Sequence, residues 1–129
     1  MQIEELSGST LAYIGDAVWS LRAREYLVNK GYGRANDLQK RSVKIVSAKA
    51  QASFWFTLEE EGFWHEDELE VFRRGRNFKS TSIPKNTDPQ TYRVSTGFEA
   101  VIGYVHLKKD EKRVEEIWNR VRKLMEEEI

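Results

Sequence analysis

The chain contains no cysteine, only two prolines and no long apolar run, and its formal net charge is zero. Without cysteine it forms neither a disulfide framework nor a zinc–thiolate site, and it has no thiolate nucleophile. No apolar stretch approaches the roughly 20 residues that a membrane-spanning helix requires. The first residues show no basic segment followed by an apolar one, so we expect no export signal, no membrane partner and a cytoplasmic location.

Apolar and aromatic residues are nevertheless sufficient for one core, since 40% of the 129 residues are hydrophobic and 12% are aromatic. At this length we expect a single domain over residues 1–129. The scarcity of proline and the long patterns with a 3.6-residue period predict an all-α helical bundle.

Turns with glycine or proline separate the predicted helices. Their approximate ranges are 7–29, 36–58 with one break, 66–74, 88–107 and 111–128. Asn36 or Asp37 is expected to cap the second region, Gly62 to end it, and Pro89 to stand in the first turn of the helix that follows the loop. Residues 75–87 lack apolar periodicity and predict a long basic loop, and loops of about 12 residues are often functional in compact domains.

The zero net charge is the sum of blocks with opposite signs. Residues 20–49 carry eight basic groups against two acids, and residues 73–93 carry six against one. Residues 59–70 carry seven acids and no Lys or Arg, and we expect them to form a solvated face. Overall neutrality argues against a polyanionic partner, but two basic blocks on one face produce a strong local positive field. Ordinary solvated helix faces are the alternative for each basic block.

Two acidic residues, Asp16 and Glu99, lie in predicted helices opposite apolar rows that we expect to face the core. These rows are Leu11, Ile14, Val18 and Leu21 in the first case and Val94, Phe98, Val101 and Val105 in the second. Small neighbours such as Gly15 allow a helix or a ligand to approach closely. Acids in such surroundings are costly to bury unless a cation pairs with them. Two carboxylates from separate helices suit Mg²⁺, and a structural ion pair or a solvated acid is the alternative.

Two segments resemble the acidic motifs of ribonuclease III catalytic domains. They are residues 11–18, Leu-Ala-Tyr-Ile-Gly-Asp-Ala-Val, and residues 96–104, Thr-Gly-Phe-Glu-Ala-Val-Ile-Gly-Tyr. Further segments resemble more closely Mini-ribonuclease III, the compact bacterial branch of this family that lacks a double-stranded-RNA-binding domain. They are residues 45–52, 74–77, 84–88 and 90–93. The resemblance covers about residues 11–107, with the motifs in the same order.

The resemblance implies a homodimeric ribonuclease III catalytic fold and Mg²⁺-dependent cleavage of double-stranded RNA that leaves 5′-phosphate and 3′-hydroxyl ends. It implies that Asp16 and Glu99 are the catalytic, metal-binding pair and that the substrate is the precursor of 23S rRNA. At three positions where full-length ribonuclease III has an acidic residue, this chain has Ser9, Ala12 and Thr96. With fewer carboxylate ligands, the site holds either one or two metal ions. A ribosomal protein is a further candidate partner.

Without a separate binding domain, this chain must itself contact the RNA phosphates, which supply most sequence-independent affinity. The candidate RNA-binding cations are Arg73, Arg74, Arg76, Lys79 and Lys85 as first choice and Lys40, Arg41, Lys44 and Lys49 as second. The alternative function is a non-catalytic domain of the same fold that binds double-stranded RNA or the ribosome. The presence of both Asp16 and Glu99 favours the enzyme. A helical protein-interaction module would leave the basic loop unexplained.

Overall fold

The computed structural model describes residues 2–79 and 82–127, and these residues contain helices but no strand. The helices are α1 (Gly8–Asn29), α2 (Ala35–Val46), α3 (Ala48–Glu60), α4 (Glu66–Arg76), α5 (Pro89–Leu107) and α6 (Glu111–Glu127), preceded by a 3-10 turn at Ile3–Glu5. The predicted all-α fold is therefore confirmed. None of the helices in the described residues is long and apolar enough to cross a membrane.

Short polar side chains start four of the helices in the described residues. They accept a backbone N–H from the residue three positions later and begin α1, α3, α5 and α6; the caps are Ser7, Ser47, Asp88 and Asp110. Gly31 and Gly62 follow α1 and α3 with positive φ angles, a conformation that costs glycine little. The predicted break in the second helical region lies at Ser47.

Two predicted boundaries were wrong. Asn36 and Asp37 lie inside the first turn of α2 rather than before it, and the Asp37 carboxylate pairs with Arg41 one turn later. Helix α4 continues through Gly75, which packs on α5, so the basic loop begins later than expected. The predicted loop includes residues 80–81, which lie outside the described residues.

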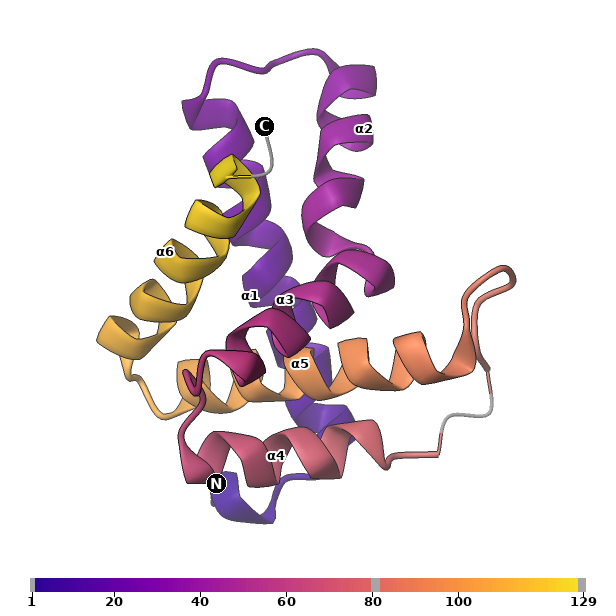
Figure 1. The fold of residues 1–129 in the computed structure, drawn as a ribbon, viewed down its shortest axis with the longest axis vertical. Coiled ribbons are helices and arrows are strands. Elements are labelled where there is room, and N and C mark those ends of the chain that lie inside the picture. The colour runs from indigo at the N-terminus through magenta and orange to yellow at the C-terminus, as the bar shows by residue number, and fades with distance from the viewer. Residues whose placement is uncertain (1, 80–81, 128–129) are drawn as a thin grey trace.

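Helix α5 forms the centre of the bundle and packs against α1, α3, α4 and α6 (Figure 1). The apolar row predicted for this helix, residues 94 to 105, is buried as expected. Trp19 of α1 meets Phe98 of α5 edge to face with 4.9 Å between ring centroids, and Trp55 of α3 stacks on Phe72 of α4 at 3.8 Å. The core therefore joins α1, α3 and α4 through α5, and α2 lies at one end of the molecule (Figure 1).

The side of α1 that was expected to face the core was predicted wrongly. Of the predicted row, only Leu11 is buried, Ile14 and Val18 are half-buried, and Leu21 is 58% exposed. The buried side instead consists of Gly8, Leu11, Ala12, Gly15, Trp19, Ala23 and Leu27. Its small residues allow α5 to lie directly on α1, so the backbone rather than large side chains makes much of this contact.

The acidic segment 59–70 is not a purely solvated face. Glu68 is buried and receives two hydrogen bonds of 2.7 Å from the guanidinium of Arg113 on α6. Asp67 accepts a hydrogen bond of 2.9 Å from the Tyr104 hydroxyl. These acids therefore tie α4 to α5 and α6, and the expectation of a solvated face was wrong for Glu68.

Candidate active site

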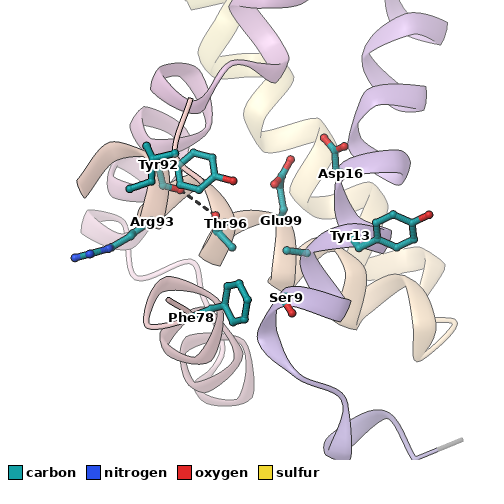
Figure 2. A pocket seen from close by; sticks show the side chains of 10 residues that line it. Ser9, Tyr13, Asp16, Phe78, Tyr92, Arg93, Thr96 and Glu99 are labelled. Atoms are coloured by element: carbon teal, nitrogen blue, oxygen red, sulfur yellow. Dashed lines mark hydrogen bonds between the residues drawn. The ribbon is translucent and has the colours of Figure 1, made fainter. Parts of the chain in front are cut away.

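The side chains of Asp16 on α1 and Glu99 on α5 point into the same space (Figure 2). Asp16 is exposed and Glu99 is half-buried. Among the described residues, no Lys, Arg or His lies within ion-pair distance of either carboxylate. The alternative of a structural ion pair therefore does not apply within the described part of the chain.

Two glycines bring the acid-bearing helices together. A Cβ atom at Gly15, the residue before Asp16, would lie 1.7 Å from the backbone oxygen of Glu99. A Cβ atom at Gly103, one turn after Glu99, would lie 2.0 Å from the backbone oxygen of Leu11. Only glycine permits crossing at this distance. The small residues around Asp16 thus make room for a neighbouring helix, and the contact places the two acids side by side.

A pocket of about 230 Å³ opens beside the two carboxylates. The loop before α5 contributes Phe78 and Ile83, and the first turn of α5 contributes Tyr92. Phe78 and Ile83 are partly exposed, so they form an apolar edge to an otherwise charged site. The apolar edge was not predicted, because these two residues stand alone in a basic loop.

The three positions at which the chain departs from full-length ribonuclease III all belong to this pocket. Ser9, Ala12 and Thr96, which stand where that protein has acids, all line the pocket. The Thr96 hydroxyl is used locally and donates to the backbone oxygen of Tyr92, 3.0 Å away (Figure 2). Among the described residues, no third Asp, Glu, His or Cys joins Asp16 and Glu99 to form a metal-binding group.

The environment of Glu99 favours its neutral form. Burial first, and then the hydrogen bond and negative charge of Asp16, raise the pKa of Glu99 to about 9, while a hydrogen bond from Gln51 acts in the opposite direction. At neutral pH the pair therefore retains a proton in the absence of a cation. A cation bound between the two carboxylates would displace that proton.

Gln51 was not predicted as part of the site. It lies on α3 and its amide nitrogen donates to Oε2 of Glu99 over 3.3 Å. The sequence does contain a signal, because Gln51 shares one helical face with Phe54, Trp55 and Leu58, all of which are buried. A polar residue on an apolar helix face requires a hydrogen-bonding partner, and here the partner is Glu99.

The candidate RNA-binding cations differ in whether their side chains already interact with other groups of the protein. Arg74 is half-buried and its guanidinium donates to the backbone oxygens of Glu4 and Leu6, so it holds the N-terminal turn in place. Arg41 pairs with Asp37 and lies over the Tyr32 ring. The exposed candidates without an ion-pair partner in the described residues are Arg73, Lys79, Lys85, Lys40, Lys44 and Lys49.

A second, basic pocket joins the first. It is formed by the end of α4 and the start of α5 and is lined by Arg76, Asn77, Lys79, Gln90 and Arg93. Arg93 also lines the pocket of the two carboxylates. It belongs to the predicted basic block but was not assigned to RNA, since only the fold brings it opposite Lys79.

Comparisons with known proteins identify the family of the chain. A family model described as "Ribonuclease III domain" matches residues 9–110. The chain is 43% identical over 116 residues to a Mini-ribonuclease 3 of Enterococcus faecalis, covering 90% of this chain and 88% of that protein. It is 44% identical over 119 residues to a Mini-ribonuclease 3 of Staphylococcus aureus, covering 92% and 89%.

The fold is also found in a solved structure. The crystal structure of a Fusobacterium nucleatum protein superposes with a TM-score of 0.82 and 28% sequence identity over 98% of both chains. The family is in general metal-dependent, generally dimeric and active on double-stranded RNA. The chain therefore belongs to the ribonuclease III family of endoribonucleases, within its Mini-ribonuclease 3 group.

Proposed function

We propose that this chain hydrolyses phosphodiester bonds in double-stranded RNA at the site formed by Asp16 and Glu99, leaving 5′-phosphate and 3′-hydroxyl ends. The observation that carries the proposal concerns the described residues: two carboxylates with no Lys, Arg or His within ion-pair distance lie next to a pocket lined by cations and by no carboxylate. An RNA phosphate and a divalent ion together neutralise both charge excesses. A protein–protein docking surface would require neither.

Mg²⁺ fits the groups that the site offers. This ion prefers oxygen ligands, keeps several of its waters and is commonly held by one or two carboxylates together with substrate phosphates. Asp16 and Glu99 would hold it, and when bound it would supply an activated water and neutralise the negative charge that develops on the phosphate. With only these two carboxylates among the described residues, a second ion would depend on RNA phosphates for its ligands.

The RNA backbone is proposed to lie along the two joined pockets. Arg76, Lys79 and Arg93 have no carboxylate within ion-pair distance among the described residues, so their charges are available to a ligand. Arg76 is oriented by a hydrogen bond from its Nε to the Asn77 side chain. Arg74, in contrast, is assigned to the protein's own structure.

A second copy of the chain is the proposed partner for the outer side of α1. That side carries Tyr13, 78% exposed, and Leu21, with Ile14 and Val18 half-buried between them. An apolar row of this kind on a small protein is typical of an interface. Because Tyr13 also lines the carboxylate pocket, dimerisation along this row would bring the partner close to each site. Two sites on one duplex would cut both strands.

The proposed natural substrate is the precursor of 23S ribosomal RNA, and the proposed location is the cytoplasm, with a ribosomal protein as the candidate that presents the RNA. Formal neutrality of the chain supports the need for such help, since non-specific affinity for RNA rises with the number of available cations. The joined pockets would therefore bind and cleave the RNA backbone, while the shape of the RNA or the partner protein would determine the position of the cut.

Cleavage of a double-stranded RNA by the wild type, Asp16→Asn and Glu99→Gln, each with Mg²⁺ and with EDTA, tests the proposal. We expect cuts with 5′-phosphate ends only for the wild type with Mg²⁺, while both variants still bind the duplex. If the wild type binds the duplex but does not cut it with Mg²⁺ present, the chain is a non-catalytic RNA-binding domain of this fold.

A further inference from the structure

Gln51 is a buried polar residue with a specific partner. It is 1% exposed and lies on the core side of α3, among buried aromatic side chains. An amide loses its hydration in such a place, and burial without a hydrogen-bonding partner would destabilise the fold. A leucine or methionine would fill the same space without this cost. The core alone therefore does not account for a glutamine here.

The partner of Gln51 is the carboxylate of Glu99. The Gln51 amide donates to Oε2 of Glu99 over 3.3 Å, across the contact between α3 and α5. Asp16 approaches Glu99 from α1 (Figure 2). The Glu99 carboxylate therefore has contacts with groups from two other helices, Gln51 on α3 and Asp16 on α1. Helix α3 is fixed at its start by the Ser47 cap, one turn before Gln51, which limits how far the amide can move.

The chemical nature of the donor matters for a metal ligand. A Lys or Arg at this position would also hold the carboxylate, but its charge would cancel the negative charge that attracts a cation. A neutral amide restricts the rotation of the carboxylate and leaves that charge intact. Groups that hydrogen-bond to metal ligands orient them in this way, and their removal typically lowers metal affinity or activity by 10- to 100-fold.

We propose that Gln51 is a positioning residue that holds the Glu99 carboxylate in the orientation in which it and Asp16 share a Mg²⁺ ion. This inference rests on the proposed function, because it assigns a role to Gln51 only where the two carboxylates bind a metal. Gln51 touches neither the RNA nor the ion. It acts through Glu99.

The test uses two substitutions of Gln51 and one matched control. Gln51→Met keeps the length of the side chain and removes the amide, and Gln51→Glu places a third carboxylate beside the pair. Gln39→Met makes the same chemical change on the exposed side of α2. The measurements are the melting temperature over a series of Mg²⁺ concentrations without RNA, and kcat and KM for a double-stranded RNA.

For Gln51→Met we expect the Mg²⁺ concentration that gives half of the metal-induced rise in melting temperature to increase by about 10- to 100-fold. We expect kcat at fixed Mg²⁺ to fall while KM for RNA stays close to that of the wild type. For Gln51→Glu we expect a lower melting temperature without metal and a larger recovery when Mg²⁺ is added. Gln39→Met should match the wild type in every measurement.

A melting temperature that falls equally with and without Mg²⁺, together with an unchanged half-saturating Mg²⁺ concentration, would overturn the inference and make Gln51 a structural residue only. Wild-type protein that shows neither a Mg²⁺-dependent shift nor cleavage would instead overturn the proposed function, and the role of Gln51 with it. The two failures are distinguished by the wild type alone.

Discussion

The contact between α1 and α5 depends on Gly103, and replacing this residue by alanine should separate Asp16 and Glu99, the two acids proposed to act in catalysis. A Cβ atom at position 103 would lie 2.0 Å from the backbone oxygen of Leu11, whereas ordinary contacts begin at 3.4 Å. The neighbour is backbone in the middle of a helix, so no side chain can turn away. The two helices must move apart by about 1 Å or more, or the chain must bend.

The cost follows from two opposing effects. Overpacking of this kind typically costs about 1–3 kcal/mol and sometimes more, while alanine in a helix is favoured over glycine by about 1 kcal/mol. We expect Gly103→Ala to lower the free energy of unfolding by about 2 kcal/mol. The effect on catalysis should be larger, because a displacement of about 1 Å in an active site can reduce the rate by about 100-fold.

Urea denaturation and cleavage of a double-stranded RNA check this prediction, with Gly33→Ala as the control. The φ angle of Gly33 is not in the left-handed region, so alanine can adopt it, and no atom lies within 4 Å of the position of a new Cβ. Its replacement therefore makes the same chemical change without a clash between helices. Equal unfolding midpoints and equal cleavage rates for the two alanine variants would refute the idea that the glycine crossing sets the distance between Asp16 and Glu99.

The remaining predictions concern charges. Because folding raises the pKa of Glu99 from a value near 4.5 to about 9, the contribution of this group to the free energy of unfolding is complete below pH 4.5 and is lost as the pH rises through 9. Without metal, the free energy of unfolding of Glu99→Gln should therefore be about 3 kcal/mol higher than that of the wild type at pH 7 and equal to it below pH 4, as measured by urea denaturation. Arg113→Met leaves Glu68 buried without its partner and should cost about 3–5 kcal/mol, and Glu68→Met in the same chain should restore much of this loss in thermal denaturation. Arg93→Ala should weaken RNA binding and reduce the slope of log affinity against log salt by about 1, whereas Arg74→Ala should lower the melting temperature and leave that slope unchanged.

The positions of the helices were largely predictable because local signals determine them. Ser7 and Asp88 are polar residues directly before periodic apolar segments, and Gly31 and Gly62 stand directly after them. Helical periodicity and small neighbours singled out Asp16 and Glu99 one at a time, and the family motifs predicted that the two form a pair. A family motif reports which residues act together, whereas periodicity reports only which face of one helix is apolar.

Periodicity failed for α1 because residues with little hydrophobicity make its close contact with α5. Gly15 and Ala12 contribute almost nothing to an apolar pattern, yet they are buried because α5 crosses there. The apolar row that ends at Leu21 is largely not covered by the core of this chain. Similarly, Arg74 was assigned to RNA from the sequence and Arg93 was not, although Arg74 hydrogen-bonds to the protein's own backbone and Arg93 lines both pockets.

Zero net charge and a polyanionic substrate are compatible because most of the cancellation occurs away from the site. Arg113 and Arg120 form ion pairs with acids of the 59–70 segment, so their charges are already neutralised and contribute little to the field at the site. At the joined pockets the cations and the two carboxylates remain separate, so a phosphate approaching the carboxylates without a metal ion would be repelled. A divalent cation bound there would reverse that repulsion, and by thermodynamic reciprocity bound RNA would then tighten the binding of the cation by the same factor. A site with two carboxylates among the described residues would gain most from this coupling, because RNA phosphates would supply the ligands that these residues do not.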